Sequence, residues 1–154
     1  MIALPDAVTR ERAAYAYQQG ERRTHHARRN GQAHRHAWEP TTDESALTDA
    51  QAAVAEMFVA AIHCLEWTRE HATTPDKDGT DVGGFVSVRW TPLPHGALIV
   101  HEDEPNDIVG ALVTGPYPDM VYRGAIDIHR AKNPDWWRDD VRNPAYFVPQ
   151  HALK

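Results

Sequence analysis

Five polar residues in this chain have the types and the spacing of a site that hydrolyses phosphodiesters. Asp81 stands just before a run of alternating residues, and Ser87 and Arg89 lie two apart within that run. Asp103 closes the next apolar run, and Glu56 lies inside a long apolar helical pattern. Magnesium prefers oxygen ligands, typically one or two carboxylates completed by water and substrate phosphate, and a nearby protein cation stabilises the phosphate in the transition state. We therefore predict a site for Mg²⁺ or Mn²⁺ made by Asp81, Glu56 and Asp103. The predicted catalytic residues are Glu56, Asp81, Ser87 and Arg89.

Glu56 has a second interpretation, as a structural residue. Its neighbours in the helical pattern are mostly alanine and other apolar residues, and a carboxylate in such surroundings is costly to bury unless it is paired. A salt bridge to an arginine of the preceding helix would pair it.

Cys64, the only cysteine, is expected to be a buried core thiol. The spacing of His25-His26 and His34-x-His36 matches no closed zinc site.

The elements that must position these residues begin with a strand pattern. From Phe85 to Trp90, Val86, Val88 and Trp90 fall on one face, and Phe85, Ser87 and Arg89 fall on the other. A second run, from Gly96 to Asp103, follows after a short connection. We predict that the two runs form an antiparallel pair with Asp81 at its entrance and Asp103 at its exit.

Two helices are expected before this pair. Thr9 can cap a first helix that begins at about Arg10 and is ended by Asn30-Gly31. Thr48 and Gln51 have the spacing of a capping box, which predicts a second helix beginning near Thr48. This second helix is apolar nearly all round, so we expect it to be buried between the sheet and the first helix.

Later segments complete a prediction of the α+β class. We expect two N-terminal helices packed on a mostly antiparallel sheet of about four to five strands, followed by a short C-terminal helix. The proline after Asn133 suits the first turn of that short helix. The remaining predicted strands are 109–114, 121–128 and a final edge strand at 145–148.

Composition predicts one domain with an uneven distribution of charge. The chain has 154 residues, a net charge of −6 and no run approaching the ~20 apolar residues of a membrane span. We expect a soluble, cytoplasmic protein without a signal peptide. We expect residues 1–38 to form a basic helical arm, whereas residues 39–81 carry ten acids against two basic residues. The arm permits contact with nucleic acid, through Arg22, Arg23, Arg28, Arg29 and Arg35; the alternative is that this run of charge is a solvated face.

The region from 48 to 154 resembles a group of small phage and prophage proteins. The resemblance rests on short pieces that include Asp81-Val-Gly-Gly, Phe85-Val-Ser-Val-Arg89, Leu112-Val-Thr-Gly115 and Ala145-Tyr-Phe-Val-Pro-Gln150. Those proteins are in turn similar to the PD-(D/E)XK nuclease superfamily, whose metal site uses a helix glutamate, a strand aspartate and a (Glu or Gln)-x-Lys pair. The resemblance implies that Glu56, Asp81, Ser87 and Arg89 occupy these positions, in a protein of the host cytoplasm that is a candidate homodimer. Two residues depart from the pattern, because Arg89 replaces lysine and Ser87 replaces a carboxylate or amide.

Three functions follow from this pattern. The first is a metal-dependent DNA nuclease in which Arg89 binds the scissile phosphate. The second is a catalytically inactive relative that binds a partner, such as a phage-encoded regulator or inhibitor of a host defence protein; Ser87 favours this function. The third is a structural protein of the virion, for which no specific feature of the sequence speaks.

Overall fold

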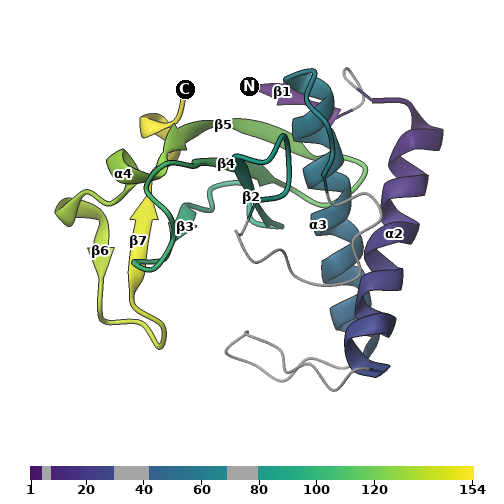
Figure 1. Ribbon diagram of the computed structural model, residues 1–154, viewed down its shortest axis with the longest axis horizontal. Helices are drawn as coiled ribbons and strands as arrows, with labels where there is room; N and C mark the ends of the chain where they lie inside the picture. Colours follow the sequence, from purple (N-terminus) through teal and green to yellow (C-terminus); the bar gives the residue numbers. More distant parts are fainter. Residues whose placement is uncertain (5–7, 30–41, 69–79) are drawn as a thin grey trace.

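The computed structural model of the chain describes residues 1–4, 8–29, 42–68 and 80–154. It confirms the α+β class, with two long helices on one side of a strand layer and a smaller sheet on the other side (Figure 1). Arg35 and the His34-x-His36 pair lie outside the described residues.

The first helix forms as its capping residues predict. Helix α2 (Arg10–Arg29) begins after Thr9, whose Oγ1 accepts a hydrogen bond from the Arg12 amide at 3.3 Å. The short element predicted at Asn133 also forms, as a single 3-10 turn, η1 (Pro134–Trp136). The Asn133 side chain accepts a hydrogen bond from the Asp135 amide at 3.1 Å. In both cases the cap acts within a few residues, so the local sequence is enough.

The predicted start of the second helix is wrong by six residues. Helix α3 (Thr42–Ile62) already contains Thr48, whose hydroxyl donates to the Glu44 carbonyl four residues earlier at 2.9 Å. Gln51 does not complete a capping box either, since its Oε1 accepts from the Tyr117 amide at 2.7 Å. A Ser or Thr hydroxyl inside a helix commonly bonds back in this way, and the capping-box spacing therefore occurred by coincidence.

Gly20 brings the two helices into close contact. A Cβ atom at this position would lie 2.2 Å from the Asp49 carbonyl oxygen and 2.4 Å from the Ala50 Cα atom of α3. Thr24, one turn further along α2, donates a hydrogen bond to the Asp49 side chain. The glycine that weakens the helix in isolation is thus the residue at which its backbone packs directly on α3.

The strands divide between two sheets. The first sheet has the order β1-β5-β4-β2, and the second has the order β3-β7-β6. Strand β2 is parallel to β4, and all other pairs are antiparallel. The bounds are β1 (Ile2–Ala3), β2 (Val86–Thr91), β3 (Leu98–Val100), β4 (Val109–Thr114), β5 (Val121–Asp127), β6 (Trp137–Arg138) and β7 (Ala145–Val148).

The predicted antiparallel pair of 85–90 with 96–103 is wrong, because β2 and β3 belong to different sheets. The strand beside β2 is β4, where Val86 is paired with Val109 and Thr91 with Thr114. Strand β4 is buried on both faces, and such a strand must lie inside a sheet. The last predicted edge strand is also misplaced. Strand β7 is central, because β3 and β6 pair with its two sides.

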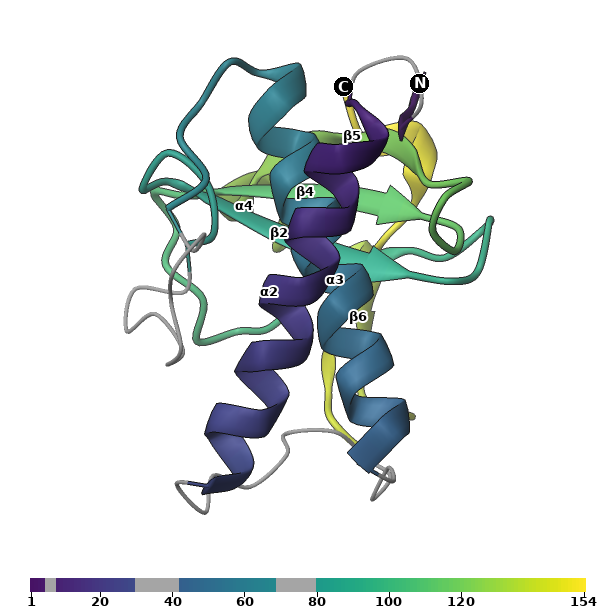
Figure 2. The same cartoon turned by 90° about the vertical axis from the view of Figure 1, so that its right-hand side faces the viewer.

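Helix α3 lies in the centre of the fold, as predicted. It packs between α2 and the first sheet, and its residues from Ala53 to Ala60 are all buried (Figure 2). The segment Glu44–Ile62 is long and apolar enough to span a membrane by length and composition, yet 61% of its most apolar window is buried inside the protein. The core helix of a soluble protein has this property. A second apolar cluster, which includes Leu98, Leu112 and Val148, fills the space between the two sheets.

Candidate functional site

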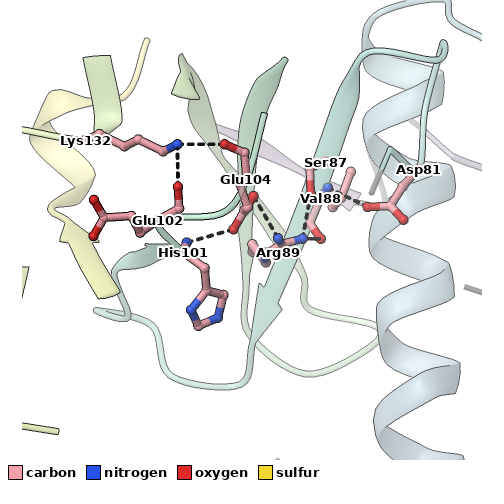
Figure 3. A network of polar contacts seen from close by, with 8 residues as sticks. All are labelled: Asp81, Ser87, Val88, Arg89, His101, Glu102, Glu104 and Lys132. Atoms are coloured by element: carbon pink, nitrogen blue, oxygen red, sulfur yellow. Dashed lines mark hydrogen bonds and ion pairs between the residues drawn. The ribbon is translucent and has the colours of Figure 1, made fainter. Parts of the chain in front are cut away.

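The polar face of β2 carries Ser87 and Arg89, which point to the same side of the strand (Figure 3). The Arg89 guanidinium donates from one nitrogen to Ser87 Oγ at 2.6 Å. Its second terminal nitrogen lies 3.0 Å from Glu104 Oε2 in an ion pair. Ser87 is only 1% exposed, so its hydroxyl serves to hold the arginine in place.

The loop from 101 to 107, between β3 and β4, is held by two cations (Figure 3). Glu104 pairs with Arg89 and also accepts from the His101 amide at 2.9 Å. Lys132 donates to the carbonyl oxygens of Glu102 and Glu104, at 2.9 and 2.6 Å. A third bond from the same ammonium reaches the Asn106 side chain at 2.8 Å. The Arg89 charge is therefore neutralised within this loop.

Asp81 binds the free edge of β2. Its Oδ2 accepts the Val88 amide at 2.8 Å, and its own amide donates to the Val86 carbonyl at 2.7 Å. Residues of β2 at odd positions bond to β4, as the bond from the Val109 amide to the Phe85 carbonyl shows. Val88 therefore directs its amide away from the sheet, and the buried Asp81 carboxylate supplies the missing acceptor.

Glu56 forms the buried salt bridge that the structural interpretation predicted. Arg23 of α2 approaches it with both terminal nitrogens, at 2.9 Å to Oε1 and 2.8 Å to Oε2. Trp67 Nε1 donates to Oε2 at 2.9 Å, and the Arg23 guanidinium lies 5.7 Å from the Trp67 ring centroid. Glu56 is 5% exposed and Arg23 is 8% exposed. A bidentate arginine and an indole N–H together satisfy the charge and both oxygens of this carboxylate.

The structure does not bring the predicted metal ligands together. Val86 and Val88 of β2 pack into the apolar cluster that contains α3, so Ser87 and Arg89 lie on the opposite face of the strand. Glu56, on α3, is thus separated by β2 from that polar face. Asp103 is exposed in the 101–107 loop. Among the described residues, no three His, Cys, Asp or Glu side chains are grouped as metal ligands. Asp81, Glu56 and Asp103 therefore do not form one cluster in the described part of the chain.

The predicted nucleic-acid contacts also separate. Arg23 is buried in its salt bridge, whereas Arg22 and Arg29 are exposed on α2. The Arg28 side chain and all of Arg35 lie outside the described part of the chain. Of the three predicted arginines whose side chains the structure describes, two are therefore open to a polyanion.

Cys64 is exposed, so the prediction of a core thiol is wrong. Its φ angle is +53°, and it follows the last turn of α3. The Leu65 amide donates to the Ala60 carbonyl at 2.9 Å and the Cys64 amide to the Ala61 carbonyl at 3.4 Å. These two bonds form a Schellman motif, in which the left-handed position is usually glycine. The strongly apolar helix before it gave no local signal of this end.

Next to this cap, His63 joins α3 to the first sheet. Its Nε2 lies 2.9 Å from the hydroxyl of Tyr122 on β5. The two rings meet edge to face, with centroids 5.4 Å apart. Burial raises the pKa of the Tyr122 hydroxyl, so this hydroxyl stays protonated at neutral pH.

Sequence reasoning missed Trp67 and Lys132. Trp67 had one available signal, because a buried indole N–H needs an acceptor, and Glu56 is the acidic residue within the apolar run from Ala52 to Ile62. Lys132 had no such signal, since it reaches a loop 26 to 30 residues away.

Comparison with family models, with curated proteins and with solved structures finds no match to this chain.

Proposed function

We propose that this protein is a non-catalytic binding module rather than a metal-dependent nuclease. The observation that supports this most directly is the arrangement around Glu56. Its carboxylate is neutralised by Arg23, accepts from Trp67, and lies on the far side of β2 from Ser87 and Arg89. A divalent ion would have to displace a buried arginine to reach it, which would leave the arginine charge uncompensated.

Arg89 supports the same proposal. In a nuclease this residue would have to bind the scissile phosphate, but its guanidinium already pairs with Glu104 and Ser87. Phosphate would compete with a carboxylate that is only 13% exposed and is itself hydrogen-bonded to His101. Four of the five polar residues that suggested hydrolysis thus have structural partners within the fold: Glu56, Asp81, Ser87 and Arg89.

A protein is the partner that we favour. The chain has a net charge of −6, and the binding of nucleic acid depends on cations that neutralise phosphates. One of the predicted nucleic-acid arginines, Arg23, is buried. In the host cytoplasm, regulation or inhibition of a host protein would require neither a metal ion nor a basic groove.

A cleavage assay separates the two functions. Purified protein is incubated with supercoiled and branched DNA and either Mg²⁺ or Mn²⁺, and the heat of divalent-ion binding is measured in parallel. We expect no cleavage and no ion-binding heat. Cleavage that requires Mn²⁺ and disappears in Asp81→Ala would refute the proposal and restore the nuclease function.

The binding arm uses the intact protein as bait. A host lysate is first treated with a commercial nuclease to remove bridging nucleic acid, and a captured protein is then purified and titrated by calorimetry. A saturable interaction with the purified partner supports the proposal. Absence of any such partner, together with tight binding of duplex DNA, contradicts it.

A further inference from the structure

Helix α2 carries a straight stripe of exposed residues along its outer side. The members are separated alternately by four and three residues, and each is exposed. They are Glu11, Tyr15, Gln18, Arg22, His25 and Arg29. We call this set the α2 stripe.

Helical geometry places the stripe opposite the contact with α3. At about 100° per residue, the six positions fall within roughly 40° of one direction, because 18 residues complete five turns. Gly20 lies at about 180° to that direction, and its backbone packs on Asp49 and Ala50 of α3. The stripe therefore lies on the side of α2 that faces away from α3, and its residues are exposed. Figure 2 shows α2 in front of α3.

The charged members of the stripe are Glu11, Arg22 and Arg29. Among residues 1–4, 8–29, 42–68 and 80–154, no side-chain hydrogen bond or ion pair is found for them. Their neighbour Arg23, by contrast, points inward to Glu56. The stripe thus presents one acid at its N-terminal end and two arginines towards its C-terminal end.

The order of these residues is self-complementary. If the stripe is read from both ends, Glu11 is matched with Arg29, Tyr15 with His25, and Gln18 with Arg22. Each matched pair is centred on position 20. We propose that a second copy of the chain binds here, with the two α2 helices antiparallel about a two-fold axis at the level of Gly20.

Each matched pair has compatible chemistry. Glu11 and Arg29 form an ion pair, Gln18 accepts from the Arg22 guanidinium, and the tyrosine ring stacks on the imidazole. A two-fold axis makes every contact twice, because residue i of one copy meets residue j of the other and the reverse. The antiparallel arrangement also places the partial positive N-terminus of each helix beside the partial negative C-terminus of the other, which is favourable.

The charge pattern favours a second copy over nucleic acid. A helix that follows a phosphate backbone needs cations along its contact, whereas this stripe has Glu11 at one end and neutral side chains at Tyr15 and Gln18. The helix is about 30 Å long, and a single polar stripe lies at the small end of protein interfaces. We therefore expect a weak dimer that dissociates as salt is added.

Charge reversal tests the pairing. In Glu11→Arg, two Arg–Arg contacts replace two ion pairs, and in Arg29→Glu, two Glu–Glu contacts do so. Each variant should weaken the dimer by on the order of ten- to thirty-fold in Kd, measured by sedimentation equilibrium at low salt. An equimolar mixture of the two variants should restore dimerisation. In the mixed dimer the arginine introduced in one variant meets the glutamate introduced in the other, and the unchanged Glu11 and Arg29 form the second ion pair.

Arg12→Glu is the matched control, since Arg12 is exposed on α2 but lies outside the stripe. It should leave the dimer unchanged, and circular dichroism should show that all variants are folded. A protein that is monomeric at the highest concentration reached would overturn the proposal. So would a dimer that both reversals leave intact, or a monomer whose stripe binds DNA and loses it in Arg22→Glu. None of these results depends on whether the protein cleaves DNA.

Discussion

Replacement of Glu56 by alanine tests the structural role of this carboxylate. The change leaves Arg23 only 8% exposed, with its charge uncompensated, and removes the acceptor of the Trp67 indole. Removal of one member of a buried ion pair typically costs about 3–5 kcal/mol. Since the stability of a domain is about 5–15 kcal/mol, we expect a large loss, visible as a lower urea midpoint.

Two further variants separate the contributions. Glu56→Gln keeps an oxygen for Trp67 and removes only the charge, so its stability should lie between those of Glu56→Ala and the natural chain. The double variant Arg23→Met with Glu56→Leu removes both charges, and it should recover part of the stability lost in Glu56→Ala, because apolar replacements of a buried pair are often neutral. The indole N–H of Trp67 then has no acceptor, which costs about 1–3 kcal/mol of stability.

The readout is the free energy of unfolding from urea titration, with divalent ions removed by chelator. A ligand role for Glu56 predicts the opposite result. In that case Glu56→Ala would have little effect on stability in the absence of metal, or would raise it by removing a buried carboxylate. A loss below about 0.5 kcal/mol, the size of an ordinary surface substitution, would refute the reasoning.

Three other substitutions have expected outcomes. Cys64→Gly should raise the free energy of unfolding by about 1 kcal/mol, because φ is +53° at this position. The gain is measured as a higher urea midpoint, and no gain would mean that the cap is not strained. Gly20→Ala should cost about 1–3 kcal/mol, seen as a lower Tm, because its Cβ meets the Asp49 carbonyl at 2.2 Å. Asp81→Ala should expose the Val88 amide to hydrogen exchange, whereas Asp81→Asn should keep it protected; equal exchange in both variants would contradict the edge role.

Local patterns predicted what local chemistry determines. The Thr9 cap placed the start of α2, and the alternation from Phe85 to Trp90 correctly assigned the two faces of β2. A carboxylate among apolar residues needs a partner. This need predicted the salt bridge of Glu56 with an arginine of the first helix. Each inference used residues within one or two turns, or a cost of burial that holds in any fold.

The pairing of strands could not be predicted in the same way. Nothing near β2 indicates that its neighbour is Val109–Thr114 rather than Leu98–Val100. The choice depends on which strand can be buried on both faces, and that depends on a second sheet whose strands lie from 98 to 148. The predicted metal site placed Asp103 by the incorrect hairpin, and Asp103 lies instead in the exposed 101–107 loop.

Helical phase could have separated the arginines of α2 before the structure was known. Ala13, Ala16 and Gly20 share one face of α2, and Arg23 continues that face three residues later. A stripe of small residues indicates where one helix packs on another, so Arg23 is expected to be buried and to need a carboxylate. Arg22 and Arg29 lie on the opposite face and are exposed. The count of basic residues in 1–38 treats these arginines as one surface. Their helical phase instead assigns Arg23 to the core and leaves Arg22 and Arg29 exposed for a partner.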